Sequence, residues 1–466
     1  MKHIPLQTFS ICVLLISFAA CSGRSNSPMP PQGPLPQSPQ SAGALMETIE
    51  APPAKAPALR FLQVFDFRMT SSQATATAKE ISYLWGGGSG SRGATPLLWQ
   101  AANPSLVDIL YFYQGTDDPR LSGHTLSWFM THHSNWVVYD CDAKNRPTKT
   151  VAYQPGLGAA VPLDISNPDV IDYQIHVAAD AAIRSGNNAI GSDQTVFFDF
   201  DGGQQPGWFG CGIYAGPNFT NFQRRWGYRG AGFPNDDPKW ASDTAAWVKT
   251  AKYILTTDVV LAPHHLKLAI NHPLGNPADP KESVLMKNAD MELDEVGFAD
   301  YGKYTREPWL LSDTLSYMTF VQSRGSAFLI VDKFGTNSHG TPPTAGITND
   351  ELTWAIATDL LGTQGRSAFY VTHGPYGVPS YFPSYATVNS RIGSACGAYA
   401  RNASGHVFYR RYTHGLVLAN DGGAGRERFT LPNHTYVDLM GAAIRNPLSI
   451  GASKAFVLFT TADGCT

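Results

Sequence analysis

The sequence carries little charge and lacks the short motifs of the common nucleotide-binding, serine-dependent and zinc-dependent enzymes. Only 15% of its 466 residues are charged, the formal net charge is -3, and Lys and Arg gather nowhere in the clusters that phosphate binding requires. Nucleic acid is therefore not expected as a partner. Neither a Walker A loop, a GxSxG elbow nor an HExxH pair occurs, which argues against NTPases, serine hydrolases and zinc hydrolases. We expect no cofactor and no metal.

Cysteine is also scarce, and no pair has CxxC spacing, which argues against a metal site. Cys12 and Cys21 belong to the N-terminal segment, so four cysteines remain for the body of the protein. An even number favours disulfides in an oxidising compartment. Four cysteines allow three pairings, and their places along the chain favour Cys141 with Cys211 and Cys396 with Cys465.

Residues 1–20 have the pattern of a signal peptide. A short cationic start precedes the apolar run ICVLLISFAA (11–20), which is too short to span a bilayer. The run ends at Phe18-Ala19-Ala20-Cys21, which resembles the lipobox of bacterial lipoproteins, although those usually carry Leu where Phe18 stands. The resemblance implies cleavage before Cys21 and its acylation, with an ordinary cleaved signal as the alternative. It places the protein in the bacterial cell envelope, at the outer membrane, on the cell surface or in the periplasm, and attached to the membrane by the lipid alone.

Residues 21–58 are expected to be a tether. After Cys21 the segment consists mainly of Pro, Gly, Ser and Gln, as in MPPQGPLPQSPQSAG, and has few large apolar residues. Such a composition cannot bury enough surface to fold. A Pro-rich spacer of this kind holds a folded body away from a membrane surface.

Residues 59–376 alternate short apolar runs with longer helical patterns, which predicts a (β/α)8 barrel, an α/β fold; an open doubly wound sheet is the competing fold. Predicted helices include NPDVIDYQIHVAADAAIRSG (167–186), DTAAWVKTAKYILTT (243–257) and NDELTWAIATDLLGTQG (349–365). The predicted strands are 59–67, 107–114, 135–140, 195–202, 265–272, 289–296, 326–334 and 367–373. From 377 to 466 the chain shows short apolar runs broken by Gly, Asn and Asp and no long helix, which predicts a small antiparallel β domain.

Acidic residues follow several predicted strands, at the end of a barrel where binding and catalytic groups gather. They are Asp66, Asp199, Asp201, Glu292, Asp294, Glu295 and Asp332. A carboxylate directly after an apolar run is costly to desolvate unless it has a purpose. Glycoside cleavage needs two opposed carboxyl groups, so the strand ends at 195–202 and 289–296 are the natural candidates. Tyr113, Trp136, Asn271 and His373 are predicted to line the same cleft.

Four segments resemble successive blocks of glycoside hydrolase barrels, namely the endo-α-1,4-polygalactosaminidases and the hypothetical glycosyl hydrolases near them. The segments are VPLDISNPDVIDYQ, TVFFDFDG, ADMELDEVGF and HVFYRRYTHGLVLAN. Carried over by position, the resemblance implies Asp199 as nucleophile or base and Glu295 as general acid. The chain departs from the family at Met291 and at Gln194-Thr195, where the family has Gly, and Glu292 and Asp294 are extra acids. The strand-six assignment therefore stays open.

These observations predict a monomeric enzyme that cleaves a polysaccharide or oligosaccharide by a two-carboxylate mechanism. The resemblance implies a substrate that contains amino sugars. The alternative is a surface lipoprotein that keeps the barrel and binds glycans without turnover. The two differ in whether a pair of carboxyl groups faces one opening.

Overall fold

The computed structural model describes residues 59–87, 95–142, 146–152, 160–197, 210–215, 220–226, 238–299, 310–335, 346–373, 376–377, 382–423 and 425–465. The predicted signal peptide, Cys21 and the Pro-rich segment lie outside these residues. In the described part of the chain, no helix is long and apolar enough to cross a lipid bilayer.

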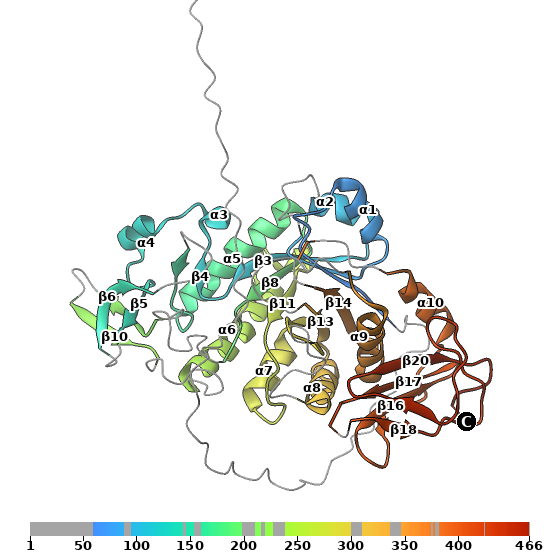
Figure 1. Cartoon of the computed structure of the whole chain (residues 1–466). Coiled ribbons are helices and arrows are strands. Elements are labelled where there is room, and N and C mark those ends of the chain that lie inside the picture. The colour runs from blue at the N-terminus through green and yellow to red at the C-terminus, as the bar shows by residue number, and fades with distance from the viewer. Residues whose placement is uncertain are drawn as a thin grey trace, which may run out of the picture.

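Eight parallel strands form the centre of the fold, neighbours in the order β1-β2-β3-β8-β11-β12-β13-β14 (Figure 1). A parallel bridge between Phe61 and Phe369 joins the first strand to the last and closes the sheet. The strands are β1 (Leu62–Val64), β2 (Tyr83–Trp85), β3 (Val107–Tyr113), β8 (Ala189–Asp193), β11 (Lys267–Asn271), β12 (Met291–Asp294), β13 (Ala327–Lys333) and β14 (Ser367–Thr372). The predicted barrel is thus confirmed.

A helix follows each barrel strand before the next one begins, and the termini of these helices carry the capping residues expected from the sequence. Asn167 caps the start of α5 and Gly186, in the left-handed conformation, its end. Thr348 and Glu351 form a capping box on α9. The helices are α1 (Ser71–Ala78), α2 (Pro96–Ala102), α5 (Pro168–Ser185), α6 (Pro238–Thr257), α7 (Pro280–Asn288), α8 (Leu311–Ser323), α9 (Asn349–Gly362) and α10 (Pro383–Arg391).

Two of the eight predicted barrel strands are wrong. The segment 135–140 contributes to β5 (Val138–Cys141), which belongs to a separate antiparallel sheet. Residues 195–197 are not in a strand, and 198–202 lie outside the described residues. The strands that take their places are β2 and β8, which the apolar pattern did not reveal.

The chain leaves the barrel after β3 and again after β8 to build a small sheet with the order β10-β9-β5-β6. Cys141 on β5 and Cys211 beside β9 form a disulfide, as predicted. In Figure 1 this sheet lies at the left of the barrel. The elements of this region are β4 (Thr116–Asp117), α3 (Pro119–Ser122), α4 (Leu126–His132), β6 (Pro147–Val151), β7 (Val161–Pro162), β9 (Gly212–Ala215) and β10 (Asn221–Arg224).

The C-terminal strands form two antiparallel sheets at the right of Figure 1, packed against α9. Cys396 and Cys465 form the second predicted disulfide. Buried Arg410 donates to the carbonyls of Leu360 (2.9 Å) and Thr363 (2.6 Å), and so caps the end of α9 from the C-terminal domain. The strands are β15 (Ala400–Arg401), β16 (Val407–Tyr412), β17 (Gly415–Asn420), β18 (Glu427–Phe429), β19 (Leu448–Ile450) and β20 (Ala455–Phe459).

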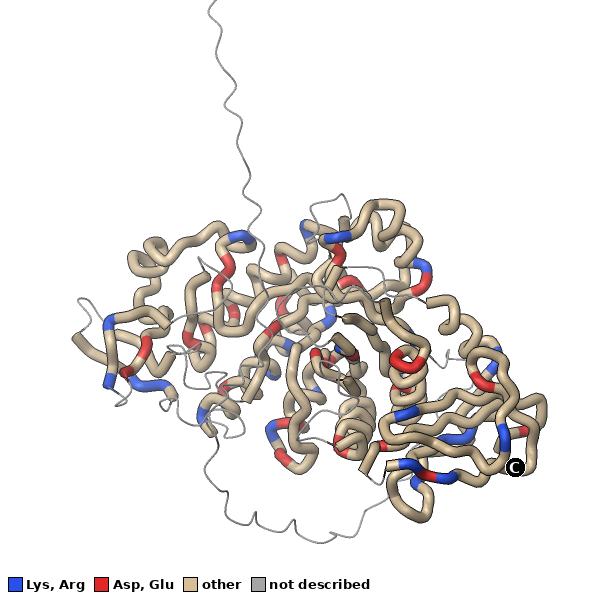
Figure 2. Tube along the Cα trace, in the orientation of Figure 1, with Lys and Arg blue, Asp and Glu red and all other residues tan. Residues whose placement is uncertain are grey.

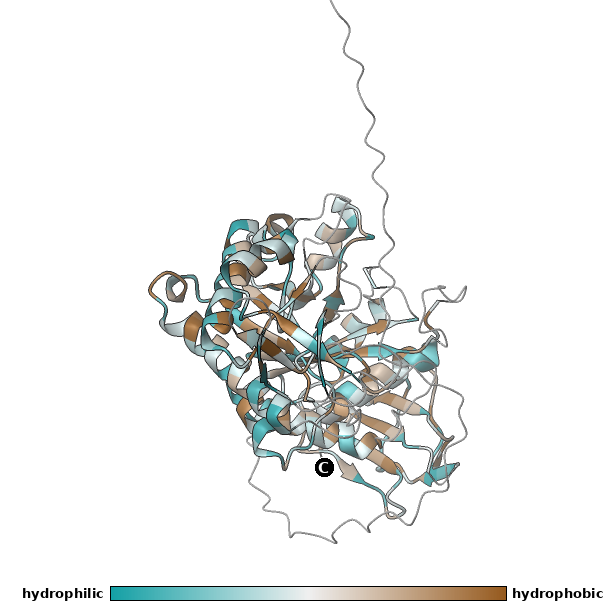
Figure 3. Ribbon diagram, turned by 90° about the vertical axis from the view of Figure 1, so that its left-hand side faces the viewer, coloured by the Kyte–Doolittle hydropathy of each residue, from teal (hydrophilic) through white to brown (hydrophobic). Residues whose placement is uncertain are grey.

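The core has two layers that follow the alternation of side chains along each strand. One set of side chains fills the barrel interior, among them Val64, Ile109, Leu293 and Leu329. The alternate set, such as Ile270, packs outward against the helices. Figure 3 shows brown, hydrophobic segments among the strands at the centre of the molecule. An acid near a strand end therefore faces either the barrel interior or the helices, depending on its position in the alternation.

Candidate functional site

Strand β12 shows how this alternation sorts the predicted acids. Met291 and Leu293 pack inside the barrel. Glu292 and Asp294 alternate with them and are electrostatic neighbours of Tyr317 on helix α8, so they face the helices. Glu295 comes directly after the strand, at the next inward position. Of these three predicted acids, Glu295 is the one that faces the mouth of the barrel.

Asp193 is the last residue of β8, the fourth barrel strand. It lies four residues after Ala189 and therefore on the same face of the strand, which points into the barrel. Its side chain is buried and accepts three hydrogen bonds. The Tyr111 hydroxyl donates to Oδ2 (2.6 Å), and Asn271 Nδ2 (2.6 Å) and the Gln194 backbone N–H (2.8 Å) donate to Oδ1. Neighbouring strands β3 and β11 supply two of these donors, so the barrel itself orients the carboxyl group.

Asp193 and Glu295 share one electrostatic environment. Burial and then the charge of Glu295 raise the pKa of Asp193 from 3.8 to about 6. Glu295 is half-buried and accepts a hydrogen bond from the Tyr376 hydroxyl (3.1 Å). Burial, the charge of Asp193 and the more weakly acting charge of Glu295 also raise the pKa of Tyr113. Both acids therefore act on the same tyrosine at the end of β3.

Aromatic rings surround this acid pair. The Phe65 ring lies 5.4 Å from that of Tyr111 and 5.9 Å from that of Tyr376, and Phe67 lies 5.8 Å from Phe65. Lys333 is the last residue of β13 and lies on the strand face that points into the barrel. Its ammonium group is 5.3 Å from the centre of the Tyr376 ring. Phe65 has a φ of 55°, a left-handed conformation that is rare for a bulky residue and is found at sites where the surrounding structure imposes it.

A buried ion pair holds the turn that follows Asp193. Gln194 has a φ of 60°, and the next carbonyl, that of Thr195, accepts from His272 Nδ1 (2.5 Å). The other ring nitrogen of His272 lies 3.1 Å from Glu282 on α7. Burial alone would lower the pKa of His272, but the charge and hydrogen bond of Glu282 outweigh it and raise the pKa above 6.5. The protonated imidazole can then donate to both partners and fix the strained turn.

Asp332 plays a comparable part for the turn that follows Glu295. Its Oδ1 accepts the backbone N–H of Phe298 (2.7 Å), while Lys333 N–H donates to the Ala299 carbonyl (3.0 Å). Burial raises the pKa of Asp332 to about 8, so the group is largely protonated at neutral pH. Asp332, on the face of β13 that packs against the helices, thus positions the loop that contains Glu295. The side chain of Glu295 faces the mouth of the barrel.

The structure brings some of the predicted site residues together and separates others. Tyr113, Asn271 and Glu295 lie at the mouth of the barrel with Asp193. Asp199 and Asp201 lie outside the described residues, so their roles stay predictions.

The remaining predicted residues have other partners. Asp66, which was expected at the mouth, is completely buried and accepts from Trp99 Nε1 of helix α2 (3.0 Å). His373 lies 2.8 Å from Glu351 on α9. Trp136 stacks on His133 (3.9 Å) beside the small antiparallel sheet. Glu292 and Asp294 face helix α8, and Asp332 holds the loop that follows Glu295.

Sequence reasoning missed Asp193, Tyr111, Tyr376 and Lys333. One signal was available for Asp193: Gly186 ends α5, and connections between a helix and the next strand are commonly only a few residues long. That rule places the fourth strand close to 189–193 rather than at 195–202. The tyrosines and Lys333 gave no comparable signal, because aromatic and basic residues at strand ends are common in packing.

The described residues of the site offer carboxyl, hydroxyl and amide groups, the ammonium group of Lys333 and, acting on Tyr113, the charge of Arg120. Among the described residues, no cluster of three or more His, Cys, Asp or Glu side chains is arranged to hold a metal ion. The arrangement can hold a polar ligand beside two acids, with aromatic rings to cover its apolar faces.

Comparison with known proteins yields similarity of fold alone. Neither a family model nor a curated protein matches the sequence. The chain is similar in structure to the GH36 alpha-galactosidase AgaA from Geobacillus stearothermophilus (TM-score 0.41, 11% identity, 88% of this chain and 56% of that chain). It is also similar to the maltogenic alpha-amylase AmyB from Thermotoga neapolitana (0.47, 11%, 86% and 98%) and to an alpha-amylase from Malbranchea cinnamomea (0.42, 9%, 87% and 96%). This chain thus spans about half the length of the alpha-galactosidase.

Proposed function

We propose that the protein is a glycoside hydrolase that cleaves an oligosaccharide or polysaccharide at the mouth of the barrel, between Asp193 and Glu295. The observation that supports this most directly is the electrostatic coupling of the two carboxyl groups, one at the end of the fourth strand and one after the sixth. Two carboxyl groups at one opening are the minimum that glycoside cleavage requires. The partly buried rings of Phe67 and Tyr376, which pack against buried Phe65, suit the apolar faces of a sugar.

The hydrogen bonds suggest how the two roles divide. Burial and the charge of Glu295 raise the pKa of Asp193 to about 6 and its three donors act in the opposite direction, so Asp193 is mostly ionised at neutral pH, which suits a nucleophile or a base that activates water. Glu295 then acts as the general acid. Its proton passes to the glycosidic oxygen as the bond from that oxygen to the anomeric carbon breaks, and Asp193 or the water it activates forms the new bond to that carbon.

Substitution of the two acids tests the assignment in the full-length protein. We expect Asp193→Ala to reduce kcat on 4-nitrophenyl glycosides and polysaccharides by about a thousandfold or more. Glu295→Ala should lose activity on polysaccharides but keep most of it on 2,4-dinitrophenyl glycosides, because that leaving group needs no proton. Added azide should restore turnover to one variant or both by replacing the missing group.

Asp199→Asn is the matched comparison, because the sequence resemblance points to that residue. If Asp199→Asn abolishes activity while Asp193→Asn does not, the fourth-strand assignment made here is wrong. If all variants match the wild type, the acid pair has no part in catalysis. Circular dichroism on each variant separates loss of function from loss of folding.

We further propose that the protein acts in the cell envelope, held by a lipid on Cys21. This rests on the N-terminal sequence: an apolar run of signal-peptide length that ends in Phe18-Ala19-Ala20-Cys21. Labelling of cells with a palmitate analogue should tag the wild type, whereas Cys21→Ala should be unlabelled and recovered in the soluble fraction. Equal labelling of both proteins would exclude this anchor.

A further inference from the structure

Strand β11 lies between the two strands that lead to the candidate acids, in the order β8-β11-β12. Asn271 is its last residue, and His272 follows. The Thr195 backbone N–H, in the turn after β8, donates to the Asn271 carbonyl (3.1 Å). The His272 backbone N–H donates to the Leu293 carbonyl of β12 (3.1 Å). These two consecutive residues therefore connect the turn after β8 to the end of β12.

The His272 side chain extends this connection on the face of the strands that packs against the helices. Nδ1 lies 2.5 Å from the Thr195 carbonyl oxygen, and Nε2 lies 3.1 Å from Glu282 Oε1 on α7. Both partners are acceptors, so the ring fits as an imidazolium that donates from each nitrogen. The Tyr317 hydroxyl on α8 donates to the other Glu282 oxygen (3.1 Å). Helices α7 and α8 are thereby linked to the turn that follows Asp193.

This network is enclosed and acidic. His272, Glu282 and Tyr317 are each only 1% exposed. Glu292 and Asp294 of β12 act electrostatically on Tyr317, and Asp294 also acts on His272. Figure 2 shows acidic residues, in red, among the barrel strands beside α7 and α8. The imidazolium thus faces acids on α7 and on β12, and its removal would leave the Glu282 carboxylate buried without a cation.

We propose that His272 is a positioning residue, whose imidazolium holds the turn after Asp193 and thereby sets the separation of that carboxyl group from Glu295. The ring is itself fixed relative to β12, because the His272 backbone N–H donates to that strand. This inference rests on the hydrolase function proposed above. The separation of the two carboxyl groups decides whether a carboxylate or a water molecule attacks the sugar. A displacement of about 1 Å can cost about a hundredfold in rate.

Two substitutions of His272 separate the two bonds of its ring. Asn places an amide N–H near the position of Nδ1, where it can donate to the Thr195 carbonyl, whereas Gln places one near Nε2, facing α7. Both are made together with Glu282→Gln, so that neither leaves a buried charge without its partner. We expect kcat on a 4-nitrophenyl glycoside to fall about tenfold or more in His272→Gln/Glu282→Gln, with KM changed by less than about threefold. In His272→Asn/Glu282→Gln, kcat should stay within about threefold of the wild-type value.

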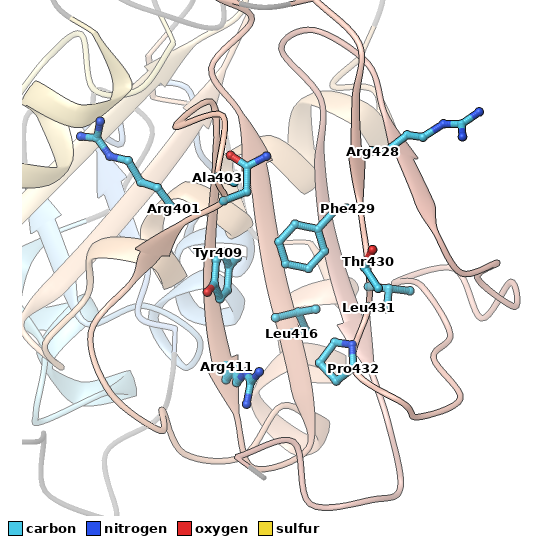
Figure 4. A pocket seen from close by; sticks show the side chains of 11 residues that line it. Arg401, Ala403, Tyr409, Arg411, Leu416, Arg428, Phe429, Thr430, Leu431 and Pro432 are labelled. Atoms are coloured by element: carbon cyan, nitrogen blue, oxygen red, sulfur yellow. The ribbon is translucent and has the colours of Figure 1, made fainter.

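Hydrogen exchange of the same variants gives a readout that needs no substrate. The peptide that contains Gln194 and Thr195 should exchange faster in the Gln double variant than in the Asn double variant, because its turn has lost the side-chain bond. His406→Gln is the matched control, since His406 pairs with Asp421 (3.0 Å) in the C-terminal domain. That domain has its own pocket of about 440 Å³, and none of the described lining residues belongs to the candidate site (Figure 4). The control should change neither kcat nor exchange at the turn.

The two readouts distinguish failure of this proposal from failure of the proposed function. Equal kcat or equal exchange in the two double variants, in a protein whose wild type is active, would overturn the positioning role of His272. A comparable loss of kcat in His406→Gln would also overturn it. Faster exchange in the Gln double variant, with no glycoside cleaved even by the wild type, would support the hold of His272 on the turn and refute the hydrolase function.

Discussion

Replacing Asp193 by Asn should make the protein more stable at neutral and alkaline pH while removing the glycoside hydrolase activity proposed above. Burial and the charge of Glu295 raise the pKa of Asp193 from 3.8 to about 6. A folded-state pKa above the unfolded value means that the folded protein binds the proton more tightly. The carboxyl group therefore destabilises the fold as pH rises: the cost is nearly absent below pH 3.8 and complete above about pH 6.

The magnitude follows from that shift of about two pKa units, each equivalent to about 1.4 kcal/mol, so the cost approaches about 3 kcal/mol at about pH 8. Asn keeps the shape but cannot ionise. The amide nitrogen of the introduced Asn would face one of the three groups that donate to Asp193, and two donors cannot bond to each other. This lowers the free energy of unfolding of the variant by an amount that does not depend on pH. The cleaner quantity is therefore the change between two pH values. The free energy of unfolding of Asp193→Asn, relative to the wild type, should rise by about 2–3 kcal/mol between about pH 4 and pH 8.

Urea unfolding followed by tryptophan fluorescence measures this difference at several pH values. The same pair in a Glu295→Gln background is the control. There the rise should be smaller, because one cause of the raised pKa is gone, but it should persist, because burial remains. Parallel pH dependences for the wild type and Asp193→Asn would refute the reasoning, since they would show that Asp193 does not titrate differently on folding.

Three other predictions concern the groups around this acid. With 2,4-dinitrophenyl glycosides, which need no proton from Glu295, the acid limb of kcat/KM should fall with an apparent pKa near 6 in the wild type. In Glu295→Gln that limb should move to lower pH, because the repelling charge is removed, and an unmoved limb would contradict the coupling. Asp332→Asn should change the free energy of unfolding by less than about 1 kcal/mol at neutral pH, because Asp332, with a pKa of about 8, is already mostly protonated. Asp332→Leu deprives the Phe298 N–H of its acceptor and should cost about 1–3 kcal/mol. Equal losses for the two variants in urea unfolding would argue against this view. Arg410→Met should cost about 2–4 kcal/mol in the same assay, since it removes the guanidinium that donates to the Leu360 and Thr363 carbonyls and leaves Leu360 with the Tyr412 hydroxyl alone. A neutral result would remove Arg410 as the link between the two domains.

The sequence predicted the barrel well because most strands and helices are long and clearly patterned. Helix α5, with Asn167 before it and Gly186 after it, is one example. Strand β8 escaped notice for a physical reason. A Cβ at Gly191 would lie 2.5 Å from Ile109 Cγ2 and 3.0 Å from the Trp85 ring, so the barrel interior leaves no room for a large side chain there. A strand that must carry Gly and Ser has no apolar pattern to recognise.

The segment that follows β8 was wrongly predicted to be a strand for the opposite reason. Val196 and Phe197 are apolar and follow one another as in a strand, but they are buried in the loop after β8. The Val196 carbonyl accepts from Trp240 Nε1 of helix α6 (2.8 Å), and the Phe197 ring lies 5.0 Å from His272. The sequence pattern consequently pointed to Asp199, which lies outside the described residues, and gave no indication of Asp193 at the end of the observed strand. Glu295 was found because β12 has a regular pattern that ends beside it.

The bridge between Cys141 and Cys211 joins cysteines that are 70 positions apart in the sequence, and all of helix α5 and the strand that ends in Asp193 lie between them. A protease that cuts the backbone once between Asp193 and Cys211 leaves two polypeptides that are still covalently joined, so the piece bearing Asp193 cannot diffuse away from the piece bearing Glu295. The nicked protein would run as a single band on a non-reducing gel and as two bands after reduction. The disulfide therefore keeps the two carboxyl groups of the candidate site in one covalently joined molecule after such a cut.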